Sequence, residues 1–174
     1  MTQDWRLRRA TAADAPAVAM VAAASFLETF AGILPGEDVV AHCARNSSPA
    51  RFAGWADDAA SVVTLAEHPV GHAPVGYSLL TRPDLPIEPL DGDIELRRIY
   101  ALSVTRGTGL GHRLMALALE DAAALGGKRL LLGVLGTNKR ARDFYEREGF
   151  TLAGTRRFNV GAGWYDDVIY ARAL

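Results

Sequence analysis

The most constraining stretch of the sequence is residues 95–125, which predict a strand, a tight glycine-rich turn and a helix. Residues 97–104 (RRIYALSV) are rich in β-branched and apolar side chains, which suit a largely buried strand. Apolar residues recur every three or four positions over residues 110–125, the period of a helix with one buried face. Gly126-Gly127 ends that helix, because glycine takes the left-handed cap conformation at low cost. The glycines of the turn are Gly107, Gly109 and Gly111.

The turn has the chemistry of an anion site. The first N–H groups of a helix have no partner inside it, and the helix dipole makes that end partly positive. Glycines remove the Cβ atoms that would hold a ligand away from the backbone. Arg106 adds a full positive charge at the entrance. The sequence therefore predicts a site for a phosphate or pyrophosphate between this strand and this helix.

The spacing of the glycines excludes two common phosphate-binding motifs. A Walker loop needs G-x-x-x-x-G-K-[ST], and no such lysine follows the turn. A dinucleotide fingerprint, G-x-G-x-x-G, would need a third glycine at the position that His112 occupies. The pattern present is R-x-x-G-x-G, formed by Arg106, Gly109 and Gly111.

The rest of the chain predicts one domain over residues 1–174, a length that supports one sizeable core. We expect an α/β (mixed α+β) fold, with a central mixed sheet of about seven strands flanked by about four helices. Thr11-x-x-Asp14 predicts a capping box at the start of the first helix, and residues 50–55 a short helical turn. The predicted strands cover residues 5–8, 61–67, 75–80, 97–104, 128–134, 150–155 and 164–171, and the predicted helices cover 12–30, 37–44, 110–125 and 139–148.

Composition narrows the class of protein. A net charge of −1 gives no sign of a surface that binds nucleic acid. Cys43 is the single cysteine, so no internal disulfide forms and nothing points to an oxidising compartment. No stretch is long enough to predict a membrane span, and we expect a cytoplasmic protein. The breakers between His68 and His72 exclude a helical metal site there, and no metal is expected.

Three local features, together with the order of elements along nearly the whole chain, resemble the GNAT superfamily of acyl-CoA-dependent N-acyltransferases. Residues 95–100 (ELRRIY) precede the R-x-x-G-x-G turn that holds pyrophosphate in this family. Residues 138–150 carry N-x-x-A-x-x-F-Y-x-x-x-G-F, typical of a later helix of the family. The ending from Trp164 to Ala171 is similar to that of many bacterial members, including some that act on diamines and small amines.

The resemblance implies acetyl-CoA as the cofactor and assigns residues to it. The backbone from residue 99 to 102 would pair with the pantetheine arm, and the turn would hold the pyrophosphate. Asn138 would reach the pantetheine or phosphate side, and Tyr145 would point at the cofactor sulfur. Three of these assignments have alternative readings. The glycines could form only a tight strand–helix turn, Asn138 could be only a helix cap, and Tyr145 could be only a core tyrosine. The backbone and turn residues so assigned are Ile99, Tyr100, Ala101, Leu102, Arg106, Gly107, Thr108, Gly109, Leu110, Gly111 and His112.

The implied reaction is acyl transfer from a thioester to an amine, which needs a proton acceptor and a proton donor. An amine with a pKa of about 10.4 is mostly protonated at neutral pH, so a base is useful. Glu95 is the first candidate by position and Asp93 the second, with a solvated strand end as the alternative reading of Glu95. Tyr145 would donate a proton to the departing thiolate.

The acceptor is expected to be a small primary amine or polyamine. Phe30, Tyr100 and Trp164 are candidate substrate walls, and the acidic residues of segment 91–95 would suit a cationic acceptor. Two other functions stay open, acetylation of a protein N-terminus or lysine in a long open groove, and binding of acyl-CoA without turnover as a sensor. The resemblance also allows a homodimer.

Overall fold

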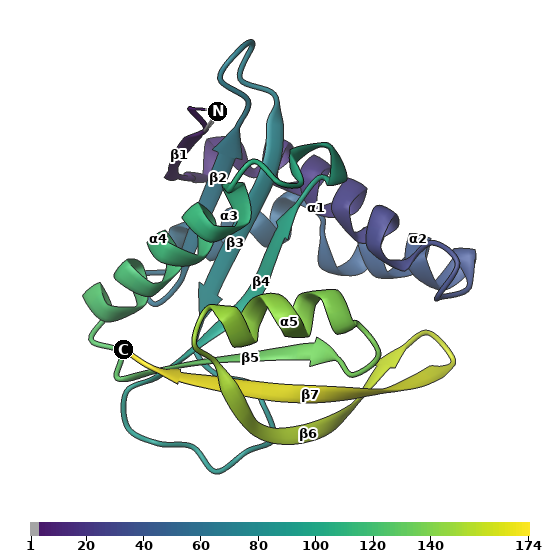
Figure 1. The fold of residues 1–174 in the computed structure, drawn as a ribbon. Coiled ribbons are helices and arrows are strands. Elements are labelled where there is room, and N and C mark those ends of the chain that lie inside the picture. Colours follow the sequence, from purple (N-terminus) through teal and green to yellow (C-terminus); the bar gives the residue numbers. More distant parts are fainter. Residues whose placement is uncertain (1–3) are drawn as a thin grey trace.

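The computed structural model describes residues 4–174 as one seven-stranded sheet with helices on both faces (Figure 1). The strands are β1 (Arg6–Arg9), β2 (Val62–Glu67), β3 (Pro74–Thr81), β4 (Asp93–Ala101), β5 (Arg129–Leu135), β6 (Thr151–Val160) and β7 (Gly163–Ala173). The helices are α1 (Ala15–Phe30), α2 (Gly36–Asn46), α3 (Pro49–Asp57), α4 (Leu110–Ala124) and α5 (Lys139–Arg147), with 3-10 turns η1 (Ala12–Asp14) and η2 (Ser103–Thr105).

The sheet has the order β1-β2-β3-β4-β5-β7-β6. Among its paired strands β4 and β5 are parallel, and α4 makes the crossover between them, as the strand–helix–strand pattern predicts. The other five pairings are antiparallel. The expected mixed fold of about seven strands is therefore confirmed, and the helical turn expected at residues 50–55 is the longer helix α3.

Apolar clusters on both faces of the sheet hold the layers together. On one face, α4 and α5 pack on the sheet through two neighbouring clusters, in which Met115 and Leu114 of α4 are fully buried. Another cluster joins α1 and α3 to the opposite face, where Val18 and Phe52 pack against Leu79. Residues 12–30 are long and apolar enough to cross a membrane by length and composition. In the fold, one face of this segment instead packs on β2 and β3.

The central strand differs from the predicted one. It begins at Asp93 and ends at Ala101, three residues before the predicted end at Val104, which is 79% exposed. The N–H of Thr105 donates to the carbonyl of Leu102 at 2.9 Å, and the Thr105 hydroxyl donates to the same carbonyl at 2.8 Å. These bonds close the turn η2 and lead the chain away from the sheet. Burial is also incomplete, because residues 97–101 are only partly covered.

The first helix starts in the predicted capping box. The backbone N–H of Thr11 donates to the Asp14 carboxylate at 2.9 Å, and the reciprocal bond from the Asp14 N–H to the Thr11 side chain is also present. Arg8 donates two further bonds to Asp14, at 2.7 and 2.9 Å, and bridges it to Glu67 of β2. The Arg8 guanidinium is the largest cause that holds the pKa of Asp14 well below its ordinary value.

Replacing Asp14 by alanine should destabilise the fold by about 1–2 kcal/mol at pH 7, because a cap and an ion pair are lost together. The lowered pKa means that the contribution of Asp14 is complete above its ordinary value of 3.8 and is lost as pH falls below it. Urea unfolding at pH 7 and pH 3 should therefore show a smaller difference from wild type at pH 3. Asp143→Ala, which removes an exposed i,i+4 pair with Lys139, is the control. An equal difference at both pH values would contradict this assignment.

Candidate active site

The site begins where β4 and β5 stop pairing. They pair over residues 93–95 of β4 and 129–131 of β5. Beyond that point β4 continues to Ala101 beside β3, and β5 continues to Leu135 beside β7. The two strands diverge, as Figure 1 shows. Each therefore has an edge without a partner strand in the described chain, and the edges line an opening in the middle of the sheet.

The open edge of β4 presents the backbone of alternate residues. Just past the end of β4, the N–H of Leu102 donates to the carbonyl of Val75 in β3 at 2.8 Å. The backbone groups of successive strand residues point to opposite sides. The N–H and C=O of Tyr100 therefore point toward β3, while those of Ile99 and Ala101 face the opening. Of the four residues predicted to pair with a pantetheine arm, these two have backbone groups that face the opening, and the pairing itself stays a prediction.

The glycine turn lies at the end of this edge and keeps its amides available. Gly107 and Gly109 have φ of 76° and 83°, which requires glycine, and a Cβ at either would meet nothing within 4 Å. The N–H of Thr108 donates weakly to the carbonyl of Thr105, at 3.3 Å. Five other amides have no hydrogen-bond partner among residues 4–174, and together with the exposed Arg106 they form a cationic end to α4. These amides belong to Gly107, Gly109, Leu110, Gly111 and His112.

The turn is held in place by its one inward-facing side chain. The indole N–H of Trp5 donates to the Thr108 hydroxyl at 3.0 Å, and that hydroxyl donates to the Thr105 carbonyl at 2.6 Å. The turn is thereby tied to a residue 103 positions earlier in the chain. Its amides are fixed before any ligand arrives, so binding does not have to order them.

Helix α5 lies against the first turn of α4. A Cβ at Gly111 would stand 3.8 Å from the ring of Phe144, and Nδ1 of His112 lies 2.9 Å from a carboxylate oxygen of Glu148. Asn138 caps α5 as predicted, since its side-chain oxygen accepts the N–H of Ala141 at 3.2 Å. The contact of Asn138 with a cofactor stays a prediction.

Tyr145 is placed on the inner face of α5. Its side chain is 9% exposed and packs against the rings of Phe150 and Tyr170. Its hydroxyl has no hydrogen bond in the described chain, where no fully buried side-chain polar atom lacks a partner, so this hydroxyl is open to solvent. Burial raises the pKa of Tyr145, and the nearby phenol of Tyr100 raises it further. Tyr145 is therefore protonated at neutral pH and able to donate.

Glu95 is not the solvated strand end of the alternative reading. It is 4% exposed, and its carboxylate accepts the N–H of Asp84 at 2.7 Å. Burial raises the pKa of Glu95, and this hydrogen bond partly opposes that change. The second candidate, Asp93, is engaged at 2.7 Å in an ion pair with Arg129, which lowers its pKa. Glu95 is thus the better proton acceptor of the two.

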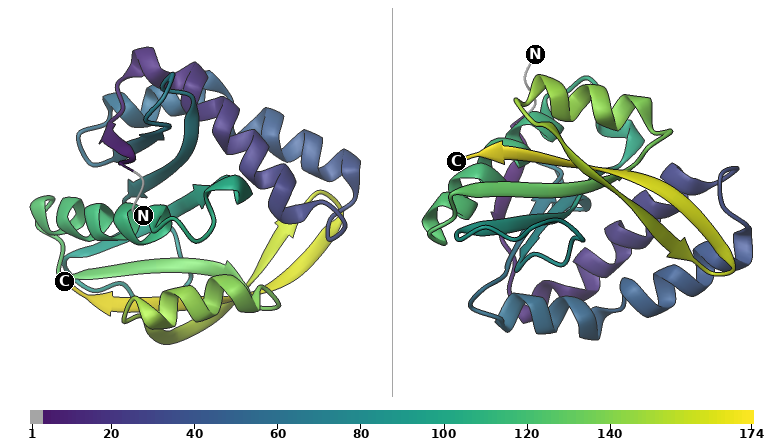
Figure 2. Two further views of the ribbon diagram at one scale, coloured as in Figure 1. Left: turned by 45° about the horizontal axis from the view of Figure 1, so that its top comes forward. Right: turned by 90° about the horizontal axis from the view of Figure 1, so that it is seen from below.

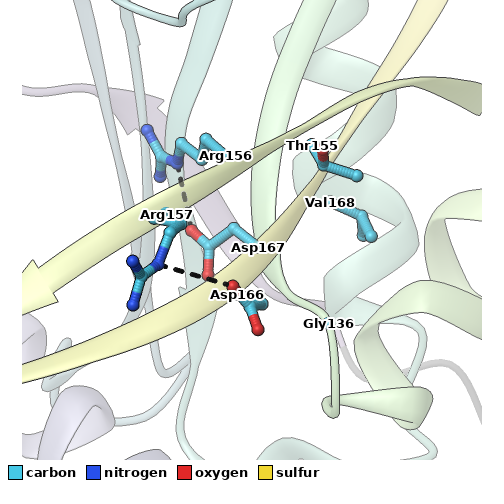
Figure 3. Close-up of a pocket in the computed structure, with 7 residues that line it drawn as sticks. All are labelled: Gly136, Thr155, Arg156, Arg157, Asp166, Asp167 and Val168. Carbon is cyan, nitrogen blue, oxygen red and sulfur yellow. Dashed lines mark hydrogen bonds and ion pairs between the residues drawn. The ribbon is translucent and has the colours of Figure 1, made fainter.

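Two residues that the sequence reasoning missed share this side of the sheet. Asp167 of β7 is 5% exposed and accepts a hydrogen bond from Nε of Arg156 at 3.1 Å. Their pair borders an open hollow of about 460 Å³ beside Gly136 (Figure 3). Burial raises the pKa of Asp167, whose charge in turn affects Tyr100. Neither residue carries a local sequence signal for this place, because it depends on the register of β7 against β5 and β6.

The three residues predicted to line the acceptor site lie in three different parts of the structure. Tyr100 stacks on Tyr77, with ring centroids 6.0 Å apart, on the face that carries α1 and α3. Phe30 packs beside Phe26 in a cluster that joins α1 and α2 to the turn between β6 and β7. Figure 2 shows this turn beside α2. Trp164 is 60% exposed, and strand alternation puts it on the face of β7 opposite Asp167.

Comparisons of sequence identify related proteins. The model of the Acetyltransferase (GNAT) family matches residues 28–150. An uncharacterized N-acetyltransferase of Mycobacterium tuberculosis is 37% identical over 161 residues, which are 92% of this chain and 98% of the relative. A protein of the same description from Mycobacterium bovis matches equally well.

Solved structures share the fold. The PaiA N-acetyltransferase of Thermoplasma acidophilum, solved in complex with coenzyme A, has a TM-score of 0.76 at 17% identity, covering 98% of this chain and 99% of its own. A ribosomal-protein-alanine N-acetyltransferase of Brucella melitensis has a TM-score of 0.67 at 25% identity, covering 97% and 99%. The arrangement of strands and helices is thus that of acetyltransferases of solved structure.

Gly109→Val should weaken binding of coenzyme A by at least about 100-fold, or about 2.7 kcal/mol, because its side chain would stand between a ligand and the amides. Gly126→Val is the matched control. Gly126 has the same φ of 83° at the other end of α4 and nothing within 4 Å of its Cβ position, so the backbone strain is equal. Calorimetric titration and thermal melting of both variants separate binding from folding. Unchanged affinity in a folded Gly109→Val protein would contradict the proposed phosphate site.

Proposed function

Because the chain belongs to the acetyltransferase (GNAT) family, and is therefore an acetyl-CoA-dependent N-acetyltransferase, we propose that it acetylates a small primary amine by direct attack in a ternary complex. The observation that carries this proposal is the set of five unpartnered amides in segment 107–112 of the described chain, which follows the open edge of β4 and lies against α5. Acetyl-CoA supplies the acyl group as a thioester.

The residues that would hold the cofactor follow from the open backbone groups. The five amides of the turn and Arg106 would bind the pyrophosphate, and the backbone of Ile99 and Ala101 would bind the pantetheine arm. Asn138 would contact the arm from the start of α5. Glycine at positions 107 and 109 leaves the approach to the amides open, which supports the fit of a diphosphate.

Glu95 would act as the base toward the amine. Deprotonating an amine of pKa about 10.4 at pH 7 costs about 4–5 kcal/mol. A buried carboxylate of raised pKa accepts that proton, directly or through water, more readily than an exposed one. One oxygen of Glu95 is already bound by the Asp84 N–H, and this bond orients the carboxylate.

Tyr145 would supply a proton to the departing thiolate. It is protonated at neutral pH, and its hydroxyl has no bond to give up in the described chain. The buried ring fixes where the hydroxyl points. Glu95 and Tyr145 thus divide the two proton transfers that amide formation from an amine and a thioester requires.

The end of the site favours a small acceptor over a protein chain. Val160, beside the β6–β7 turn, is buried against Phe26 and Val39, and a Cβ at Gly161 would stand 1.7 Å from the carboxylate of Asp38. This contact between the turn and α2 closes the end that a long groove would need open. The acidic segment gives little support to a polyamine, since Asp91 and Asp93 are paired with Lys128 and Arg129.

The test is release of free thiol from acetyl-CoA in the presence of a panel of small amines, protein N-terminal peptides and lysine peptides. We expect turnover with at least one small amine and none with the peptides. Turnover with peptides alone would favour the protein-acetylating alternative. Tight binding of acetyl-CoA without transfer to any amine would favour a sensor, and either result would overturn the proposal.

Tyr145→Phe should lower kcat by about 100-fold, because the proton donor is lost, with affinity for coenzyme A and thermal stability unchanged. Stability is preserved because the removed hydroxyl has no partner in the described residues. Tyr170→Phe is the contrasting variant. The Tyr170 hydroxyl donates to Glu146 at 2.6 Å and accepts from Arg142 at 3.2 Å, so this change should reduce stability by about 1–3 kcal/mol and spare turnover. Normal turnover in Tyr145→Phe would remove its assigned role.

Glu95→Gln should lower kcat/KM by about 100-fold and abolish the acidic limb of the pH profile. A base works only when deprotonated, so wild-type activity should rise with pH through the pKa of Glu95, above its ordinary value of 4.5. The ionisation of the amine itself adds a second rise at higher pH in both proteins. Asp93→Asn, which breaks the ion pair with Arg129, should keep the acidic limb. If Glu95→Gln keeps it too, the base lies elsewhere.

A further inference from the structure

A bulge in β4 puts a second charged residue on the same face as Glu95. The pairing of β4 with β3 shifts register between Leu79 and Leu80, which pair with Arg98 and Leu96, so that Arg97 is the extra residue. Without it Glu95 and Arg98 would point to opposite faces, since they are three positions apart. With it both lie on the face of Tyr100, α1 and α3, and because they pair with Leu79 and Thr81, two positions apart on β3, they are roughly 7 Å apart along the strand.

Arg98 has no ion pair with any residue of the described chain. Its guanidinium is partly buried, 5.2 Å from the centre of the Trp55 ring and 5.7 Å from that of Phe52. Its guanidinium donates to the hydroxyl of Ser47 at a long 3.4 Å and also lies within hydrogen-bond reach of the Tyr77 phenol. Two aromatic faces and two uncharged polar partners leave most of its five N–H donors available and its charge without a counterion.

Other arginines near Glu95 are neutralised. Arg97 is paired with Asp84 at 3.3 Å, and Arg156 with Asp167 at 3.1 Å. A partly buried charge without a counterion is unfavourable, because water that would solvate it is excluded and no carboxylate replaces it. Of these three arginines, only Arg98 has no carboxylate partner in the described chain.

The titratable groups nearest to Arg98 carry no negative charge at pH 7. Burial lowers the pKa of His42 to about 4, with Arg98 and Arg45 contributing, so this imidazole is neutral at pH 7. Burial raises the pKa of the Cys43 thiol and of the Tyr77 phenol, so these groups also carry no charge. No residue near the guanidinium therefore supplies the negative charge that it lacks.

We propose that Arg98 binds a carboxylate of the acceptor, and that the acceptor is therefore an amine that also bears a carboxylate, such as an α-amino acid. The guanidinium fork matches a carboxylate with two parallel hydrogen bonds. The amine end of the same molecule would lie toward Glu95, which the bulge places on the same face of β4 as Arg98. This inference rests on the proposed function.

The experiment compares matched acceptors in the thiol-release assay. Each of the standard α-amino acids is tested beside its own amide, which keeps the amine and removes the carboxylate charge. We expect at least one amino acid to react with a kcat/KM at least tenfold above that of its amide. Amine basicity alone would favour the amide, because its amine is less basic and is more often neutral at the assay pH. A preference for the amino acid would therefore not be an effect of basicity.

Arg98→Gln should then lower kcat/KM for the preferred amino acid by about 100-fold, mainly through KM, and change the rate with its amide by less than threefold. Arg51→Gln is the matched control, because Arg51 lies 4.9 Å from the centre of the same Trp55 ring but is exposed. Arg98→Lys should restore little, since an ammonium does not make the paired bonds. Binding of coenzyme A should be unchanged in all three variants.

The outcomes separate this inference from the proposed function. If wild type acetylates no amine at all, the proposed function fails. If it acetylates amides as well as amino acids, or if Arg98→Gln lowers both rates equally, acetyl transfer stands and the role of Arg98 is overturned. A loss of coenzyme A affinity in Arg98→Gln would also overturn it, because it would assign Arg98 to the other side of the site.

Discussion

Backbone hydrogen-bonding groups in a folded chain need partners, and among residues 4–174 this fold leaves two neighbouring sets of them without one. One set is the outer edge of β4 at Ile99 and Ala101, and the other is five of the six amides of segment 107–112. Two features create them, the divergence of β4 from β5 and the positive φ of Gly107 and Gly109. A ligand with hydrogen-bonding groups along an arm and a diphosphate at its end completes both.

The cofactor side and the acceptor side of the proposed site differ in the chemical groups that line them. The cofactor side would consist of backbone, and its specificity would come from the geometry of a strand edge and a helix end. The acceptor side would consist of side chains on the face that carries α1 and α3, namely Glu95, Arg98, Tyr100, Arg156 and Asp167. Members of a family with this division can keep one cofactor while the acceptor changes with a few substitutions.

The same division decides how much the sequence could predict. Glycine spacing, the capping box of Thr11 and Asp14 and the cap by Asn138 are local patterns, and the structure confirms the turn and both caps. The mixed sheet followed from the order of elements. Arg98 and Asp167 could not be assigned in this way, because their roles depend on the register of β4 against β3 and of β7 against β6, which one-residue slips would invert. The bulge at Arg97 leaves no clear mark in the sequence.

Burial was the other quantity that local reasoning could not supply. Glu95 and Asp93 are both acidic residues near the start of one strand, and their spacing alone does not rank them. The loop after β3 covers Glu95 and donates the Asp84 N–H to it, while Asp93 meets Arg129 from the neighbouring strand. Trp164, an aromatic residue in a family-like ending, points outward because strand alternation places Tyr165 inward instead.

The divergence of β4 and β5 also determines how firmly the two halves of the sheet are joined. Strands β1–β4 and strands β5–β7 form two half-sheets whose direct ladder is only residues 93–95 against 129–131. With three residue pairs this ladder is the shortest in the sheet, so the two halves are joined least firmly there, and an extended molecule lying along the opening would bond to β4 on one side and meet α5 on the other. Occupation of the site would therefore act as an added strand that braces the two halves, and its departure would leave this ladder as the most compliant line across the sheet.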